Sequence, residues 1–389
     1  MRKLLFAIAA AIAGSVLLAA PQPQAKAPST APTTKPLAAN LARDISITSK
    51  TPEAVEAFKK GRDYSENVRT VEAVEQFKKA LGIDPAFALA HAYLGGSLPG
   101  REGLKELERA ASLSSGLPEA ERTLIDIMLA ERRGEEDKFR KLQRGLVTMA
   151  PGDWRAHFGL GAQLSTERKW DEAIAELKKA VDLEPKAGSV QNAIGYVYLN
   201  MGKSDQAVEA FRNYAALMPG EPNPQDSLAE ALMASGKFDE SEAAFRKAAE
   251  ISPQFWVAWE GVAMGRFLRD NWAEGREALG SAKEAASRPI DKLETDTMLA
   301  WSLAAEGNLA EALRILDGVE KTAELQRVDV TRAFVPIDRA LLLADSGKPE
   351  EALRLTSAAL EKAEKASLPG AVMNNVRRFS LAVRISAES

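Results

Sequence analysis

Cysteine is absent from all 389 residues, so the chain can form neither disulfides nor thiolate metal sites, and it has no cysteine nucleophile. Histidine occurs only twice, which leaves few candidates for metal ligands or general bases. An excess of one charge is also missing, because 51 basic and 55 acidic residues are interspersed along the chain. We therefore expect no basic surface that could neutralise nucleic-acid phosphates.

Runs of β-branched residues with alternating polarity are missing as well, whereas Ala, Leu, Glu and Lys dominate the composition. These abundant residues favour helices. Hydrophobic residues make up 46% of the chain, which is enough for a continuous core and too much for a disordered protein. The sequence therefore predicts an all-α fold that is stabilised by packing.

The N-terminus has the pattern of an export signal. Arg2 and Lys3 precede an unbroken run of apolar and small residues that ends at Ala20. Because such a run is at the short edge for a membrane span, an uncleaved N-terminal anchor over residues 1–20 is the alternative. Residues 21–50 begin with a stretch rich in Pro, Ala and Thr, which predicts a flexible linker. We expect an exported, periplasmic protein.

Proline and glycine return at nearly constant intervals. Each recurring proline follows an amphipathic stretch by a few residues, where it cannot continue a helix. The glycines recur between two such stretches, where a turn can require a positive φ. The prolines are Pro85, Pro118, Pro151, Pro185, Pro219 and Pro253, and the glycines are Gly202, Gly236, Gly307 and Gly347. This spacing predicts a repeated helix–turn–helix unit.

Small and large apolar residues also hold fixed places in the unit. The first unit carries Gly61, Ala73, Phe77 and Ala80 at these places, and later units repeat the set. The chain thus resembles the tetratricopeptide repeat family, whose unit has 34 residues. The resemblance implies a right-handed α-solenoid of about nine helix–turn–helix units over residues 51–369. Residues 370–389 are expected to form a C-terminal capping helix.

Some units depart from this pattern. The third unit carries Phe139 where a small residue is expected, so its register is uncertain. The eighth and ninth units are expected to start near Leu293 and Ala333.

Motifs for catalysis or cofactor binding are not evident. His91 and His157 both occupy the fourth position of a first helix, a packing position that holds Trp259 elsewhere, so we assign them a structural role. Gly159 and Gly161 follow no strand and lack the third glycine of a nucleotide-binding loop. We expect no enzyme activity, cofactor or metal site.

The resemblance implies that a partner binds the concave surface, which the first helix of each unit lines. Aromatic, Met and Asn side chains there would suit a peptide. The candidate groove residues are Phe158, Asn192, Tyr196, Asn200, Met233, Met264, Phe267 and Trp301. Core packing is the alternative for several of them, above all Phe267 and Met264.

The carboxylate clamp for which the family is best known is not carried by this chain. Two of the positions that such a clamp would use hold Asp226 and Glu230. We therefore expect a different ligand, and a protein- or peptide-binding scaffold of the bacterial cell envelope. Nucleic acid is not an expected partner, and a membrane would be contacted only through a retained N-terminal segment.

Two other functions stay open. One is an accessory or regulatory subunit of an envelope enzyme or secretion complex, bound through the convex face. The other is a solenoid that binds a small molecule or glycan, although no convergent polar cluster in the sequence supports it.

Overall fold

The computed structural model describes residues 44–365 apart from positions 68, 99 and 327, together with residues 376, 377, 380, 381 and 383. The expected signal peptide and most of the expected linker lie outside these residues. The described residues form α-helices and contain no strand, so the all-α prediction is confirmed. None of the described helices combines the length and apolarity needed to span a membrane.

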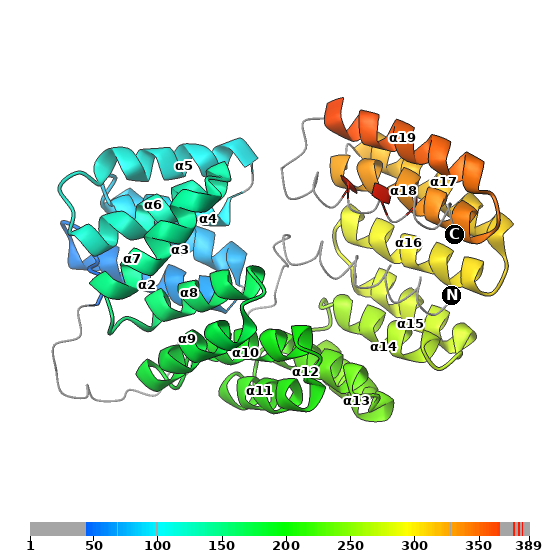
Figure 1. Ribbon diagram of the computed structural model, residues 1–389, viewed down its shortest axis with the longest axis horizontal. Helices are drawn as coiled ribbons and strands as arrows, with labels where there is room; N and C mark the ends of the chain where they lie inside the picture. Colours follow the sequence, from blue (N-terminus) through cyan, green and yellow to red (C-terminus); the bar gives the residue numbers. More distant parts are fainter. Residues whose placement is uncertain are drawn as a thin grey trace. The chain divides into compact units, whose positions relative to one another are not determined.

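The chain divides into two compact units, and the N-terminal unit ends at Lys237. Within it each helix packs against the next, as the blue to green ribbons of Figure 1 show. Its described helices are α2 (Pro52–Glu66), α3 (Thr70–Ile83), α4 (Ala88–Ser97), α5 (Gly100–Leu113), α6 (Glu119–Arg133), α7 (Glu136–Met149), α8 (Trp154–Thr166), α9 (Trp170–Leu183), α10 (Gly188–Asn200), α11 (Ser204–Leu217) and α12 (Pro222–Ala234).

The C-terminal unit begins at Phe238. Its described helices are α13 (Phe238–Ile251), α14 (Val257–Phe267), α15 (Trp272–Ala285), α16 (Pro289–Ala305), α17 (Leu309–Gln326), α18 (Asp329–Asp345) and α19 (Pro349–Lys365). The described residues of the two units together form eighteen helices, twice the number of repeats expected from the sequence.

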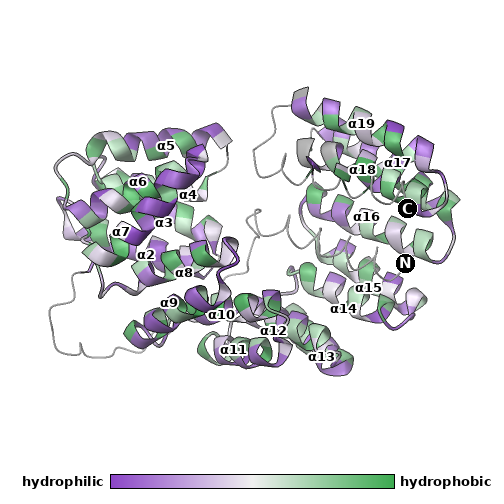
Figure 2. Ribbon diagram, in the orientation of Figure 1, coloured by the Kyte–Doolittle hydropathy of each residue, from purple (hydrophilic) through white to green (hydrophobic). Residues whose placement is uncertain are grey.

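The pairs pack through the small and large residues that the repeat predicts. A Cβ atom on Gly195 would lie only 2.5 Å from the ring of Phe211, so only glycine allows this contact between α10 and α11. Ala173 and Ala207 are fully buried at the corresponding close approaches. Hydrophilic and hydrophobic residues alternate along the helices (Figure 2), as expected for helices that bury one face.

The turn between the helices of a pair has a left-handed residue at one fixed position. The glycines predicted there, Gly202 and Gly236 among them, have positive φ angles of 72° and 74°. The same position holds Arg168 with a φ of 60° and Asp270 with a φ of 63°. A side chain with a Cβ is strained in this region. The turn geometry therefore persists even where the sequence does not supply glycine.

The last two pairs are longer than the regular unit. Helices α16 and α18 begin at Pro289 and Asp329, ahead of the expected starts near Leu293 and Ala333. Helices α16 to α19 have 17 or 18 residues, whereas most upstream helices have 13 to 15. The extra helical turns of α16 to α19 therefore add residues that have no counterpart in the regular unit.

Most of the expected capping helix over residues 370–389 lies outside the described residues. Val376, Ser380 and Val383 are described, and all three are helical and buried. Their spacing places them on one face of a helix.

Candidate functional site

Three of the eight predicted groove residues are buried and do not line an open surface. Phe267 is 1% exposed and stacks on Trp272 with ring centroids 5.3 Å apart. Met264 and Trp301 are 7% and 8% exposed. The groove prediction is therefore wrong for these three side chains. The repeat pattern could not distinguish a side chain on the open face of a first helix from one that packs against its neighbour.

The other five residues are accessible to different degrees. Phe158 is half-buried against Trp154, with ring centroids 6.0 Å apart, and Met233 is half-buried too. Asn200 is exposed, whereas Asn192 and Tyr196 are half-buried in a polar cluster. The accessible part of the predicted groove is therefore more polar than the sequence indicated.

This polar cluster joins α10 and α12. The Tyr196 hydroxyl donates to Glu230 Oε2 at 2.9 Å and lies 3.2 Å from the hydroxyl oxygen of Ser227. The Ser227 hydroxyl in turn donates to Asn192 Oδ1 at 3.2 Å. The first helices of two consecutive pairs are therefore connected by a chain of hydrogen bonds.

Asp226 lies one turn before Glu230 on α12, so the two carboxylates share a helix face. Asp226 is 6% exposed, and its Oδ1 atom has no hydrogen-bond partner. Burial raises the pKa of Asp226 well above its usual range, and the charge of Glu230 raises it further. Burial also raises the pKa of Glu230, and the hydrogen bond from Tyr196 offsets only part of this effect. Burial and mutual repulsion therefore both favour the protonated form of this pair.

A second set of carboxylates lies in the C-terminal unit, on α14, α16 and α18. Glu260 accepts a hydrogen bond of 2.9 Å from the hydroxyl of Thr295, and Asp338 accepts one of 3.3 Å from Trp301 Nε1. The residues of this acidic cluster are Glu260, Asp291, Glu294 and Asp338. They interact electrostatically with one another, and Arg288 pairs with Asp291 at 2.7 Å.

Three carboxylates of the acidic cluster, Glu260, Glu294 and Asp338, have raised pKa values. Burial raises the pKa of Glu294 to about 8, with Asp291 adding to the effect. Burial raises the pKa of Asp338 to about 7, against the hydrogen bond from Trp301. Burial and then the charge of Glu294 raise the pKa of Glu260 well above its usual range. Strongly shifted groups of this kind are concentrated at functional sites.

The sequence contained a signal for these carboxylates. Asp226 and Glu260 both occupy the fifth position of a first helix, a position that the resemblance assigns to the binding surface. In the sequence, Asp226 and Glu230 indicated only that a carboxylate clamp is missing. Acidic residues at buried helix positions are unusual, and carboxylates at a packing position of the repeat could have identified the cluster.

The segment just before α2 is attached to the N-terminal unit by hydrogen bonds. Residues 45–50, which we call the strap, have no regular secondary structure and are held on the N-terminal unit by carboxylates. Asp153 Oδ2 accepts a hydrogen bond from Ile45 N–H at 3.1 Å. Glu121 accepts two from Thr48, one from its N–H to Oε1 at 3.1 Å and one from its hydroxyl to Oε2 at 2.6 Å. Asp84 Oδ2 accepts one from the Ser49 hydroxyl at 2.7 Å and one from Lys50 N–H at 3.0 Å.

The strap behaves like a bound peptide. Its backbone N–H groups meet carboxylates at the starts of three consecutive pairs, and Ile45 is 8% exposed among Ile127, Leu146 and Ala156. Composition could not reveal this contact, because its partners lie far along the chain. The chain itself therefore occupies this surface of the N-terminal unit.

Long-range ion pairs also fill part of the N-terminal unit. The Arg155 guanidinium on α8 donates to Glu66 on α2 at 2.5 Å and covers the ring of Trp154. Arg69, next to α3, pairs with Glu221, next to α12, at 3.8 Å. Side chains of distant repeats thus meet within this unit.

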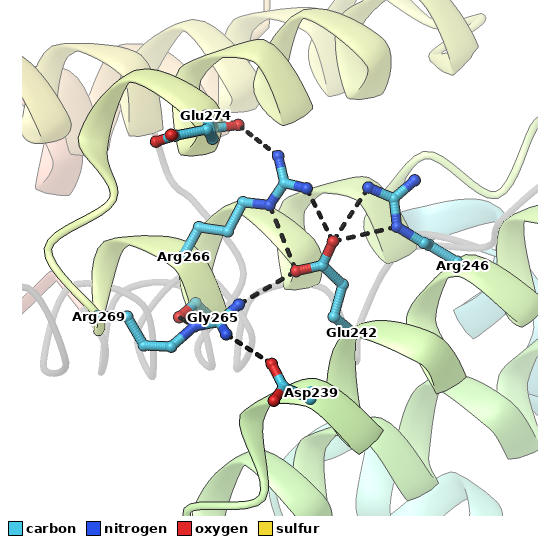
Figure 3. Close-up of polar contacts among 7 residues, drawn as sticks. All are labelled: Asp239, Glu242, Arg246, Gly265, Arg266, Arg269 and Glu274. Atoms are coloured by element: carbon cyan, nitrogen blue, oxygen red, sulfur yellow. Dashed lines mark hydrogen bonds and ion pairs between the residues drawn. The ribbon is translucent and has the colours of Figure 1, made fainter.

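Arginines gather around Glu242 on α13 (Figure 3). Arg246, Arg266 and Arg269 all donate to the Glu242 carboxylate, at distances between 2.8 and 3.3 Å. The hydrogen bond from Arg266 holds the pKa of Glu242 below its usual range. Arg269 also donates to Asp239 at 2.8 Å. We interpret this cluster as a structural tie between α13 and α14, because its guanidinium groups already have anionic partners.

Both histidines are engaged in matching contacts. His157 Nδ1 lies 2.7 Å from Glu176 Oε2, and its Nε2 lies 3.1 Å from the carbonyl oxygen of Pro151. His91 makes the equivalent contacts with Glu106 and Pro85. This geometry supports a structural role. Within the described part of the chain, no three His, Asp or Glu residues are placed to hold a metal ion.

Comparison with known proteins shows that the chain is similar to tetratricopeptide repeat proteins. Family models of the tetratricopeptide repeat match residues 163–222, 192–254 and 293–317. MamA from Desulfovibrio magneticus RS-1 is a similar solved structure, with 16% identity, a TM-score of 0.39, and coverage of 43% of this chain and 94% of that one. A tetratricopeptide repeat protein from Parabacteroides merdae ATCC 43184 has 13% identity, a TM-score of 0.42, and coverage of 85% and 100%. No curated protein matches the sequence.

Proposed function

Because the chain is a tetratricopeptide repeat protein, we propose that it is a protein-binding scaffold whose acidic cluster receives a basic segment of its partner. The observation that carries this proposal is the gathering of Glu260, Asp291, Glu294 and Asp338 beside one arginine, Arg288. The described helices form stacked pairs, which is an architecture for protein interaction.

The electrostatics favour a cationic partner. Four carboxylates with one guanidinium cannot all ionise without strong mutual repulsion, and desolvation strengthens that repulsion. A Lys or Arg side chain of a partner would supply the missing charge and hydrogen-bond donors. Trp301 and Thr295 hold two of the carboxylates in place. The site is therefore preorganised for a cation.

We further propose that the partner lies in the bacterial cell envelope. The basic residues and apolar run at the N-terminus support export of the chain, either as a cleaved protein or with the segment retained as an anchor.

Peptide binding to the full-length chain tests the proposed function. A fluorescent peptide of alternating Lys and Ala should bind, and an alternating Glu and Ala peptide of the same length should not. The double variant Glu294→Gln with Asp338→Asn should weaken binding of the basic peptide. A matched double variant, Glu350→Gln with Glu351→Gln, removes two exposed charges of the same unit and should leave binding unchanged. Equal binding of both peptides, or equal loss in both double variants, would refute the proposal.

A further inference from the structure

The strap lies across the starts of three first helices in succession, α4, α6 and α8. Its hydrogen-bond acceptors there are Asp84 shortly before α4, Glu121 in the first turn of α6, and Asp153 at the N-cap of α8. Because Ile45 meets Asp153 while Lys50 meets Asp84, the strap runs opposite to the order of the helices. Three repeats therefore form one surface to which a single segment binds.

Two of these acceptors are oriented by their own repeats and not by the strap. Asp153 Oδ1 accepts the N–H of Arg155 at 2.9 Å as the cap of α8, while Oδ2 faces Ile45. Asp84 Oδ1 accepts the N–H of Ala86 at 3.1 Å, while Oδ2 faces the strap. A side chain that caps a turn or a helix start has its orientation fixed locally. The hydrogen-bonding surface is therefore preorganised for a segment with N–H donors.

The surface also favours a hydroxyl and a positive charge. Both oxygens of Glu121 accept hydrogen bonds from Thr48, one from its N–H and one from its hydroxyl. Burial acts to raise the pKa of Asp84, but hydrogen bonds from Lys50 N–H and the Ser49 hydroxyl, together with the charge of Lys50, hold it below its usual range. Donors and a cation are thus the partners that these carboxylates bind.

An apolar pocket completes the surface. Ile45 is 8% exposed in a cluster with Ile127, Leu146 and Ala156, which come from α6, α7 and α8. It is the one buried side chain of the strap, and its two neighbours in the chain are exposed. A segment held by one buried side chain and a few hydrogen bonds opens more readily than the helices beneath it. The strap can therefore leave while the repeats stay folded.

We propose that this surface, which we call the strap groove, is a peptide-binding site that the strap keeps closed. The strap groove consists of Asp84, Glu121, Asp153 and the pocket around Ile45. Its ligand is an extended segment of a partner protein with the pattern of the strap itself: an aliphatic residue, a Ser or Thr three residues later, and a basic residue two residues after that.

The partner segment has to displace the strap. Because the strap continues directly into α2, it competes at an effective concentration on the order of millimolar. The strap groove and the acidic cluster lie on different helices, so this proposal does not depend on the function proposed for the cluster.

Release of the strap in the full-length chain tests the proposal. Ile45→Asp places a carboxylate in the apolar pocket beside Asp153 and should detach the strap. A fluorescein-labelled peptide of residues 44–50 should then bind about tenfold more tightly than to the wild type, measured by fluorescence anisotropy, because the groove has lost its own occupant. Ser46→Asp adds the same charge at an exposed position and should behave as the wild type. Equal affinity of the wild type and Ile45→Asp, or binding to neither, would overturn the proposal.

Two further changes locate the peptide. In the Ile45→Asp chain, Glu121→Gln should weaken binding by about tenfold, because its hydrogen bonds lose the assistance of the charge. Glu119→Gln removes an exposed charge from the same helix and should leave binding unchanged. A peptide that itself carries the change Ile45→Asp should not bind. Wild-type affinity for that peptide, or an unchanged affinity in a folded Glu121→Gln chain as judged by circular dichroism, would contradict the assignment.

The occupant and the site are tested separately. Adding Glu294→Gln with Asp338→Asn to the Ile45→Asp chain should leave peptide binding unchanged, whereas a loss would place the peptide at the acidic cluster and rule out the strap groove. Analytical ultracentrifugation should give the same association state for the wild type and Ile45→Asp. A wild-type dimer that Ile45→Asp dissociates would identify the strap of a second copy as the occupant and refute the partner assignment.

Discussion

Replacing Thr48 by Val should destabilise the N-terminal unit, because it removes one donor from a fully buried carboxylate. Glu121 is 0% exposed, and its Oε2 atom accepts the Thr48 hydroxyl at 2.6 Å. Valine has the shape of threonine, so packing is kept while the donor is lost. The Thr48 N–H still donates to Glu121 Oε1 at 3.1 Å.

The size of the effect follows from the environment of Glu121. A hydrogen bond to a charged group contributes about 1.5–3 kcal/mol, and stranding its buried acceptor costs a similar amount. Thr48 itself is exposed, so water can partly replace the lost hydroxyl. We therefore expect the free energy of unfolding to fall by about 1–2 kcal/mol. Release of the strap limits the loss, because detachment also recovers conformational entropy.

The effect should depend on pH in a defined direction. Burial raises the pKa of Glu121, and the two bonds from Thr48 lower it in part. Without the hydroxyl, the pKa of Glu121 rises further, so the folded variant takes up a proton more readily as the pH falls. The stability deficit of the variant should therefore be larger at pH 8 than at pH 5.

Urea unfolding of the full-length chain measures the deficit, and hydrogen exchange at residues 45–50 reports whether the strap stays bound. Thr48→Ser keeps the hydroxyl and is the matched control, with an expected change below about 0.5 kcal/mol. Equal stability of the Val and Ser variants at pH 8 would show that Glu121 does not depend on the strap.

Three other substitutions probe the repeats and the acidic cluster. Arg168→Gly should raise the free energy of unfolding by about 0.5–1 kcal/mol, because glycine relieves the strain of a positive φ. A lower melting temperature of this variant in thermal denaturation would contradict the reasoning. Gly195→Ala should lower the free energy of unfolding by about 1–3 kcal/mol, because its methyl group would lie 2.5 Å from Phe211, and unchanged urea stability would contradict the close approach. Glu294 ionises near its ordinary pKa in the unfolded chain but keeps its proton up to about pH 8 in the folded protein, so the free energy of unfolding of the wild type should fall between pH 5 and pH 8. The variant Glu294→Gln should show a smaller fall over this range. Identical pH profiles of stability would rule out the raised pKa.

The spacing of prolines, glycines and alanines in the sequence was sufficient to predict the repeat. The prolines and glycines located the helix ends and the left-handed turns, since both residues restrict or permit particular backbone angles. The pairing of Gly195 with Phe211 was also predictable, because close helix packing requires a small residue opposite a large one. These features depend on local geometry that the repeat imposes in each unit.

The binding surface was less predictable, because it depends on which side of a helix a neighbour covers. Met264, Phe267 and Trp301 have the composition of a groove but pack in the core. Glu294 lies near the start of the lengthened helix α16. The regular spacing placed the start of this helix near Leu293, whereas it begins at Pro289. Contacts between the strap and residues far along the chain leave no periodic signal at all.

Proton release during binding tests the central claim most directly. Calorimetry of the basic peptide at pH 7 in buffers of different ionisation enthalpy counts the protons exchanged. A bound cation lowers the pKa of Glu294 and Asp338, which are about 8 and 7 in the free protein, so binding should release protons to the buffer. The release should disappear in the double variant Glu294→Gln with Asp338→Asn. Peptide binding without proton release in the wild-type chain would contradict the assignment of the acidic cluster as the partner site.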